Sequence, residues 1–149
     1  MDVLIGQRTT YTKKESVRSN WILVDANEQI LGRMASQVVN RLLGKHRIDY
    51  QPGVLTGDNV VIINASKVKV TGNKMEQKEY IWHTGFFGGL KRRLMKKQAE
   101  TFPEKIILLA IKGMLPKNKF GRKVLTRVKV FPGAEHNLAA QQPVPFKLI

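Results

Sequence analysis

The run Val60-Val61-Ile62-Ile63 restricts the fold of this chain more than any other feature, because all four side chains are apolar and β-branched. Residues of this kind favour extended strands. A strand with no polar position has no face to offer to water, so it must be covered on both sides, as strands in parallel sheets are. The run therefore predicts a central strand of a parallel sheet.

A strand followed by a helix is predicted near the start of the chain. Trp21 to Val24 is a short apolar run that indicates a buried strand, and residues 27–29 are typical of a turn. From Leu31 to Leu42 the apolar residues recur at helical spacing, and Gly44 suits a helix C-cap. Strand, turn and helix in this order predict an α/β unit.

A second helix is predicted later in the chain. Thr101 and Glu104 have the spacing of a capping box, Pro103 suits the first helical turn, and Pro116 ends the pattern. The side chains expected to face the core are Ile106, Ile107, Ala110, Ile111 and Met114. Strands are expected at 78–83 and 128–130, with a glycine-rich loop at 84–89 between the first of these and the basic segment after it.

The domain organisation follows from length and patterning. With 149 residues, one domain is expected, and 42% hydrophobic residues suffice for a core. Residues 1–20 are polar and lack periodicity, which predicts an N-terminal extension lying on a partner or in solvent. Residues 21–149 are predicted to form the single domain, including a C-terminal tail of little periodicity from Ala134.

The charge of the chain limits its partners. It has 26 basic and 11 acidic residues, a net charge of +15, and a compact domain with that charge needs a polyanion nearby. The segment from Lys91 to Lys129 holds thirteen basic and two acidic residues, so +11 of the net charge lies there. A field concentrated in this way is typical of phosphate binding by a nucleic-acid-binding protein.

Several other classes of protein fit the sequence poorly. The absence of cysteine excludes disulfides, thiolate zinc sites and a cysteine nucleophile, and it suits a reducing compartment. No apolar run approaches the ~20 residues of a membrane span, and the N-terminus lacks a signal-peptide core. A membrane-surface helix needs an apolar face for lipid, whereas both predicted helices need theirs for the core. A cytosol-like setting is expected.

The aromatic content of the chain distinguishes two modes of RNA recognition. Proteins that read single strands use aromatic platforms, and only 7% of this chain is aromatic. Trp82, Phe86 and Phe87 suit base stacking, but packing within the protein explains them equally well. Recognition of backbone and shape in folded RNA is therefore favoured over readout of base sequence.

The sequence offers little support for catalysis. The three histidines are far apart and lack metal-binding spacing. Asp25, at the end of a predicted strand, is more often a turn cap than a catalytic carboxylate. The loop at 84–89 is neither a dinucleotide fingerprint nor a Walker loop, although its glycines allow backbone N–H groups to approach a phosphate. No enzymatic activity, cofactor or metal is expected.

A series of short motifs in fixed order covers residues 20–143. They are Leu31-Gly32-Arg33-Met34-Ala35-Ser36, Leu42-Leu43-Gly44-Lys45, Thr56-Gly57-Asp58, Asn64-Ala65, Val70-Thr71-Gly72-Asn73-Lys74, His83-Thr84-Gly85 with Gly88-Gly89, residues 112–118, Gly121-Arg122, Glu135-His136 and Ala140-Gln141-Gln142-Pro143. Together they closely resemble the L-thirteen family of large-subunit ribosomal proteins, in its bacterial or organellar form.

The resemblance implies a three-layer α/β/α fold around a mostly parallel sheet of about four strands, with extended N- and C-terminal segments. It also implies binding to large-subunit rRNA of the 23S type early in ribosome assembly, with neighbouring large-subunit ribosomal proteins as further partners and no catalysis. The location implied is the ribosome of the cytoplasm, a plastid or a mitochondrion. Any Mg²⁺ involved belongs to the RNA.

Charge, loop chemistry and resemblance together predict the RNA-binding residues. These are Lys45, His46, Arg47, Lys74, His83, Thr84, Gly85, Gly88, Gly89, Lys91, Arg92, Arg93, Lys96, Lys97, Lys112, Lys117, Lys119, Arg122, Lys123 and Arg127. Lysine and arginine are expected to bind phosphates, while loop amides and His83 contact sugar or bases.

Two rival hypotheses stay open at this point. A basic RNA-binding module outside the ribosome, such as a chaperone or repressor, shares the charge but not the ordered motifs. A small α/β enzyme using Asp25 or His83 with the glycine-rich loop predicts saturable binding of a small phosphorylated ligand.

Overall fold

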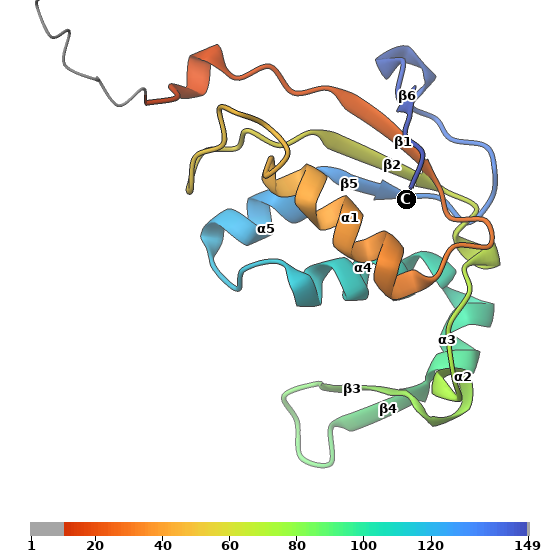
Figure 1. Ribbon diagram of the computed structural model, residues 1–149. Helices are drawn as coiled ribbons and strands as arrows, with labels where there is room; N and C mark the ends of the chain where they lie inside the picture. The colour runs from red at the N-terminus through yellow and green to blue at the C-terminus, as the bar shows by residue number, and fades with distance from the viewer. Residues whose placement is uncertain (1–10, 149) are drawn as a thin grey trace, which may run out of the picture.

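The centre of the molecule is a sheet of four parallel strands in the order β5-β2-β1-β6 (Figure 1). A computed structural model of the chain describes residues 11–148. The strands of this sheet are β1 (Trp21–Asp25), β2 (Asn59–Ile63), β5 (Val128–Val130) and β6 (Val144–Pro145). The three strands predicted in this sheet are confirmed, and so is the α/β class with a mostly parallel sheet.

The register of the sheet explains the apolar run in β2. Val60 pairs with Ile22 and Val128, and these three side chains belong to the main core. Val61 points to the opposite face, because successive side chains of a strand alternate. Both valines are fully buried, so β2 is covered on both faces, as the run predicts.

Helix α1 (Leu31–Leu43) lies on the core face of the sheet. All six apolar positions of its predicted stripe are buried, and Gly44 forms the C-cap in the left-handed conformation, with φ +78°. A Cβ atom at this position would lie 2.5 Å from the Thr56 hydroxyl oxygen. Glycine is therefore required here both by backbone conformation and by the close approach of the following loop.

The connections decide which face of the sheet each segment covers. The steps from β1 to β2 and from β2 to β5 go the same way across the sheet, so right-handed crossovers put α1 and α4 (Pro103–Met114) on one face. The step back to β6 carries the C-terminal segment, with the 3-10 turn η3 (Ala139–Gln141), over the other face. This is the predicted three-layer α/β arrangement.

Two details of the predicted second helix are wrong. Thr101 ends helix α3 (Met95–Thr101), where its hydroxyl donates to the Lys97 carbonyl oxygen at 2.6 Å, so it does not cap α4. Met114 is 46% exposed, whereas Leu115 just beyond the helix is buried. The apolar stripe continues from Ile111 to the residue four positions later, which leaves Met114 outside it.

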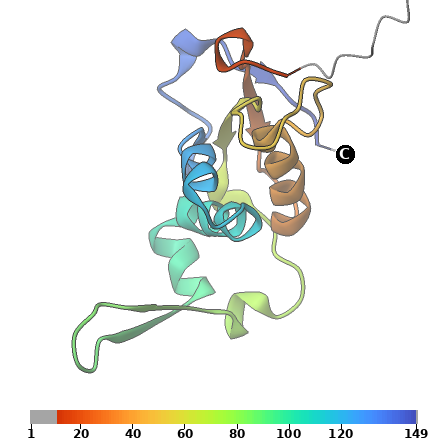
Figure 2. The same cartoon turned by 90° about the vertical axis from the view of Figure 1, so that its left-hand side faces the viewer.

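Several elements have no counterpart in the predictions. Strand β3 (Glu79–His83), which is predicted, pairs antiparallel with β4 (Leu90–Leu94), which is not. This hairpin projects away from the main sheet (Figures 1 and 2). The other unpredicted elements are α2 (Lys74–Gln77), α3, α5 (Lys119–Leu125), β6 and the 3-10 turns η1 (Lys14–Ser16), η2 (Ala65–Lys67) and η3.

The described part of the N-terminal segment lies against the loop before β2. The backbone N–H of Thr12 donates to the Gln51 side chain at 2.9 Å, and that of Asn20 donates to Asp58 at 3.2 Å. Residues 1–10 lie outside the described part of the chain. The division at residue 20 and the role of the extension stay predictions.

Candidate RNA interface

The thirteen basic residues of segment 91–129 are mostly exposed. Only Arg93 and Arg127 among them are half-buried. Within residues 11–148, Arg92 alone among the thirteen forms an ion pair, with Glu79 at 3.8 Å. Ion pairs with acids elsewhere in the fold therefore do not compensate the positive charge of this segment. We call the surface formed by these thirteen residues the basic surface.

The β3–β4 hairpin carries one part of the basic surface. Paired residues of an antiparallel hairpin share a face, so Trp82, Lys91 and Arg93 lie on one side, where the Arg93 guanidinium lies 5.7 Å from the centre of the Trp82 ring. The opposite side exposes Ile81 and Leu90, which are 56% and 51% exposed. Lys96 and Lys97 follow on α3 and are also exposed.

The hairpin tip is aromatic and open to solvent. Phe86 is 78% exposed and Phe87 fully so, which excludes packing of these two rings within the described part of the chain. Gly85 and Gly88 have positive φ, and a Cβ atom on Gly89 would lie 2.6 Å from the Phe86 carbonyl oxygen. The glycines therefore permit a tight turn that holds both rings outward.

Backbone bonds within the tip limit which groups are available to RNA. The N–H groups of Thr84 and Gly89 donate to carbonyls of the loop, and that of Gly85 donates to His83 Nδ1 at 2.9 Å. Within the described residues the amides of Phe86, Phe87 and Gly88 have no partner. Because His83 Nδ1 accepts, the neutral ring carries its proton on Nε2, which can donate to a ligand.

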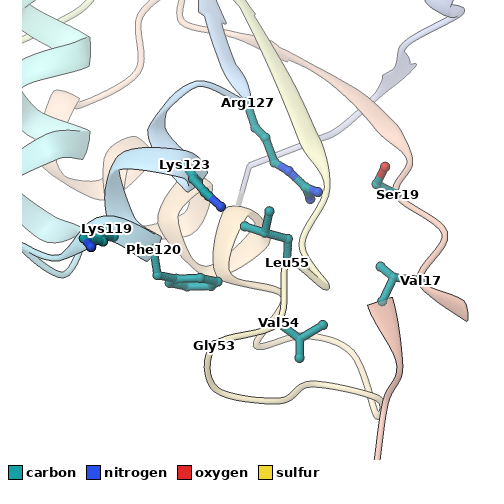
Figure 3. A pocket seen from close by; sticks show the side chains of 9 residues that line it. All are labelled: Val17, Ser19, Gly53, Val54, Leu55, Lys119, Phe120, Lys123 and Arg127. Carbon is teal, nitrogen blue, oxygen red and sulfur yellow. The ribbon is translucent and has the colours of Figure 1, made fainter. Parts of the chain in front are cut away.

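Helix α5 carries another part of the basic surface. Asn118 caps it by accepting from the Gly121 N–H at 2.8 Å. Lys119 and Lys123, four residues apart, lie on one side of the helix and line a pocket together with Arg127 (Figure 3). The other side has a groove lined by Lys112, Lys117 and Arg122. Two cationic hollows thus flank one short helix.

The cluster Lys45-His46-Arg47 has a different environment. His46 Nε2 lies 3.1 Å from the carboxylate of Asp58, whose side chain is only 4% exposed, and Arg47 Nη1 lies 3.7 Å from it. Arg47 also donates to Asp49 at 2.9 Å, and this bond lowers the pKa of the Asp49 carboxyl. Lys45 alone in the cluster is exposed and without an ion pair among the described residues.

Three residues that the predictions omitted contribute to these surfaces. Asp58 organises the cluster at 45–47, and the only signal for it was its position in the Thr56-Gly57-Asp58 motif directly before the buried run. The predicted Lys74 lines a hollow of about 600 Å³ together with Arg33 and Lys78. Arg33 and Lys78 lie in separate segments of the chain, so nothing in the sequence indicated that they would be close together.

The structure gives the groups weighed for catalysis ordinary structural roles. The carboxylate of Asp25 accepts from the Asn27 N–H at 2.9 Å and from the Asn64 side chain at 2.8 Å, so it caps the turn after β1. Within residues 11–148 there is no group of three or more potential metal ligands. No helix in that range is long and apolar enough to cross a membrane.

Comparison with known proteins identifies the family. The family described as "Ribosomal protein L13" matches residues 19–137. The large ribosomal subunit protein uL13 of Thermotoga maritima is 48% identical over 142 residues, 95% of each chain. Its counterparts in Lawsonia intracellularis and Acidithiobacillus ferrooxidans are 45% and 47% identical over 141 residues, covering 95% of this chain and 98% and 99% of theirs. The chain belongs to the ribosomal protein L13 family.

Proposed function

We propose that the chain is a structural, non-catalytic constituent of the large ribosomal subunit that binds and stabilises its 23S-type rRNA. The basic surface is the observation that carries the proposal, because only one of its thirteen cations forms an ion pair with another described residue. Release of counterions from the RNA on binding such a surface supplies most of the affinity. Relatives of near-identical length carry the name large ribosomal subunit protein.

The two parts of the surface divide the work of recognition. The exposed cations of α3, α4 and α5 bind phosphates and fix the orientation of the protein on the RNA. The hairpin tip reaches further, and Phe86 and Phe87 stack on unpaired bases there, as aromatic side chains do in RNA-binding proteins. His83 Nε2 and the free amides of the tip donate to sugar, base or phosphate oxygens.

The side of the hairpin opposite Trp82 suits the remaining partners, because it presents apolar side chains beside the Glu79–Arg92 ion pair. Ile81, Leu90 and Leu94 are each about half-exposed on that side, and contact with neighbouring large-subunit proteins or RNA would remove them from water. The setting proposed is a bacterial-type ribosome in the cytoplasm. The alternative is a basic RNA-binding module outside the ribosome, which shares the basic surface.

Early assembly requires that the protein bind rRNA before other proteins arrive. Full-length protein is titrated onto purified, protein-free 23S-type rRNA between 50 and 400 mM KCl. We expect tight binding whose logarithm falls linearly with the logarithm of salt concentration. Arg122→Gln should lower the slope by about one, whereas Lys147→Gln, beyond β6 at the other edge of the sheet, serves as the charge-matched control and should leave it unchanged.

Sedimentation of cell lysate separates the ribosome from the alternative. We expect the protein in the large-subunit fractions at moderate salt and near-physiological Mg²⁺. Protein that stays off large subunits but still binds RNA would support the alternative. Absence of salt-dependent binding to any large RNA would refute both.

A further inference from the structure

A pocket of about 410 Å³ lies between three segments that are far apart in the sequence (Figure 3). Helix α5 and Arg127 form one side, and the loop residues 53–55 lie opposite them. Val17 and Ser19 of the N-terminal segment complete the lining. Small-ligand sites span roughly 300–1,000 Å³, so this volume accommodates a single small group and excludes an RNA helix.

The lining combines an apolar wall with cations. Phe120 is half-buried and packs against the core, and Val54 and Leu55 are the other apolar side chains of the loop and helix that line the pocket. Lys123 reaches toward the same space from the next turn of α5 (Figure 3). Lys119 adds a second lysine, and none of the acidic residues in the described part of the chain lines the pocket.

Arg127 is a fixed donor at this site. One of its guanidinium nitrogens donates to the Gly57 carbonyl oxygen at 2.5 Å, and its remaining donors have no partner among residues 11–148. Burial lowers the pKa of Arg127, while the charge of Asp58 opposes that shift. Arginine nevertheless stays protonated at neutral pH because its ordinary pKa lies far above neutrality. A half-buried cation with unused hydrogen-bond donors is well suited to bind an anion.

We propose that this pocket binds one unstacked nucleotide of the rRNA, with its base against Phe120 and Leu55 and its phosphate on Lys123 and Arg127. The inference rests on the proposed function and deepens it. An isolated phosphate would leave the apolar wall exposed, and a purely apolar ligand would bury cations without counter-charge. A nucleoside phosphate has a flat base and an anion at a distance set by one sugar, so it satisfies both halves of the lining.

Folded RNA offers such a nucleotide where a base is extruded from a loop or bulge, and proteins hold these bases on aromatic side chains. A free nucleotide presents the same chemistry to the pocket. The experiment therefore has to distinguish a nucleotide of the rRNA from a free nucleotide.

The test is chemical probing of protein-free 23S-type rRNA, base by base, with full-length wild-type protein and with two variants. Phe120→Leu keeps an apolar side chain against the core, and Lys123→Gln changes an exposed residue that the fold does not need. We expect the wild type to change the reactivity of one base or two adjacent bases in a way that both variants lose, with the rest of the footprint intact.

Affinity gives a second readout. Loss of base stacking should weaken rRNA binding roughly 5- to 100-fold in Phe120→Leu, and loss of a phosphate contact should lower the salt slope of Lys123→Gln by about one. Lys147→Gln is the control and should match the wild type in both assays. Melting temperatures within about 3 °C of the wild type would exclude unfolding as the cause.

Each other outcome has a defined meaning. Wild-type binding with identical footprints and affinities in both variants would overturn this inference and leave the proposed function standing. In a calorimetric titration without RNA, AMP should bind the pocket with a Kd no lower than about 1 mM, which corresponds to a binding free energy of only about 4 kcal/mol. Micromolar AMP binding that Phe120→Leu abolishes would reassign the pocket to free nucleotides. Failure of the wild type to bind rRNA would refute the proposed function itself.

Discussion

Two basic clusters of this chain look alike in sequence and differ in the folded molecule. Lys45-His46-Arg47 follows α1, and the residues from Lys117 to Lys123 follow α4. In the first cluster His46 and Arg47 lie within 4 Å of the buried Asp58 carboxylate. In the second, no acid forms an ion pair with any cation among the described residues. The difference teaches that a run of cations leaves an uncompensated positive surface only where the fold supplies no acid.

The first cluster links segments that are distant along the chain. Asp58 precedes β2, and besides its contacts with His46 and Arg47 it accepts from the Asn20 N–H just before β1. Arg127, just before β5, donates to the neighbouring Gly57 carbonyl. These contacts tie together the starting ends of three parallel strands. We therefore expect His46 and Arg47 to contribute to stability, and we expect mutations to separate them from charge that serves binding.

The largest effect is expected for Asp58→Ala. Arg47, His46 and the Asn20 N–H would lose their partner, which should lower the free energy of unfolding by roughly 3 kcal/mol. Urea denaturation followed by circular dichroism measures the change. Glu79→Gln, which removes the exposed partner of Arg92, is the matched control and should cost less than about 1 kcal/mol. Equal losses in the two variants would contradict a special role for Asp58.

The next effect is expected at the hairpin tip. Replacing Phe86 and Phe87 together by alanine should weaken rRNA binding by about 1–3 kcal/mol for each stacked base. Because both rings are exposed in the free protein, the stability should change by no more than about 0.5 kcal/mol. Fluorescence binding and urea denaturation of the same preparation test both statements. A large loss of stability would mean that the rings pack within the protein.

A smaller effect is expected when the second cluster is neutralised. The double variant Lys117→Gln, Arg122→Gln should lower the salt slope of rRNA binding by about two, one for each lost phosphate contact. Its unfolding curve should overlay that of the wild type. His46→Gln should do the reverse, with a lower stability and an unchanged slope. A reduced slope in His46→Gln would erase the distinction between the two clusters.

The smallest effect is expected in acid. The bond from Arg47 holds the pKa of Asp49 below its ordinary value of 3.8. A carboxyl whose pKa is lower in the folded state adds stability above the unfolded pKa and loses it as pH falls through the folded pKa. Asp49→Asn should therefore flatten the decline of stability below about pH 4 and do little at pH 7. Denaturation curves measured from pH 2 to pH 7 give the comparison, and an unchanged acid decline would count against the Arg47 contact.

The predictions for the candidate site were weakest where partners come from distant segments. The sequence grouped His46, Arg47 and Arg127 with the RNA-binding residues, yet His46 and Arg47 lie against Asp58, and one donor of Arg127 is used on the Gly57 carbonyl. Their RNA-binding role stays untested, as does that of the whole predicted set. Phe120 gave no signal at all, because a single aromatic residue in a basic segment has no period to reveal which way it faces.

The sequence by itself determined the elements whose burial is periodic. The run at 60–63, the stripe of α1 and the alternation at 128–130 reported their environment directly, since a buried face must be apolar at the spacing of the element. Strand β4 escaped because four of its five side chains are exposed, so no alternation marks it. The dipeptide β6 escaped because it is a strand only through its pairing with β1. The tertiary structure alone decided these pairings, which of the two basic clusters has a counter-ion, and the three-sided pocket beside α5, because each depends on contacts between residues far apart in the chain.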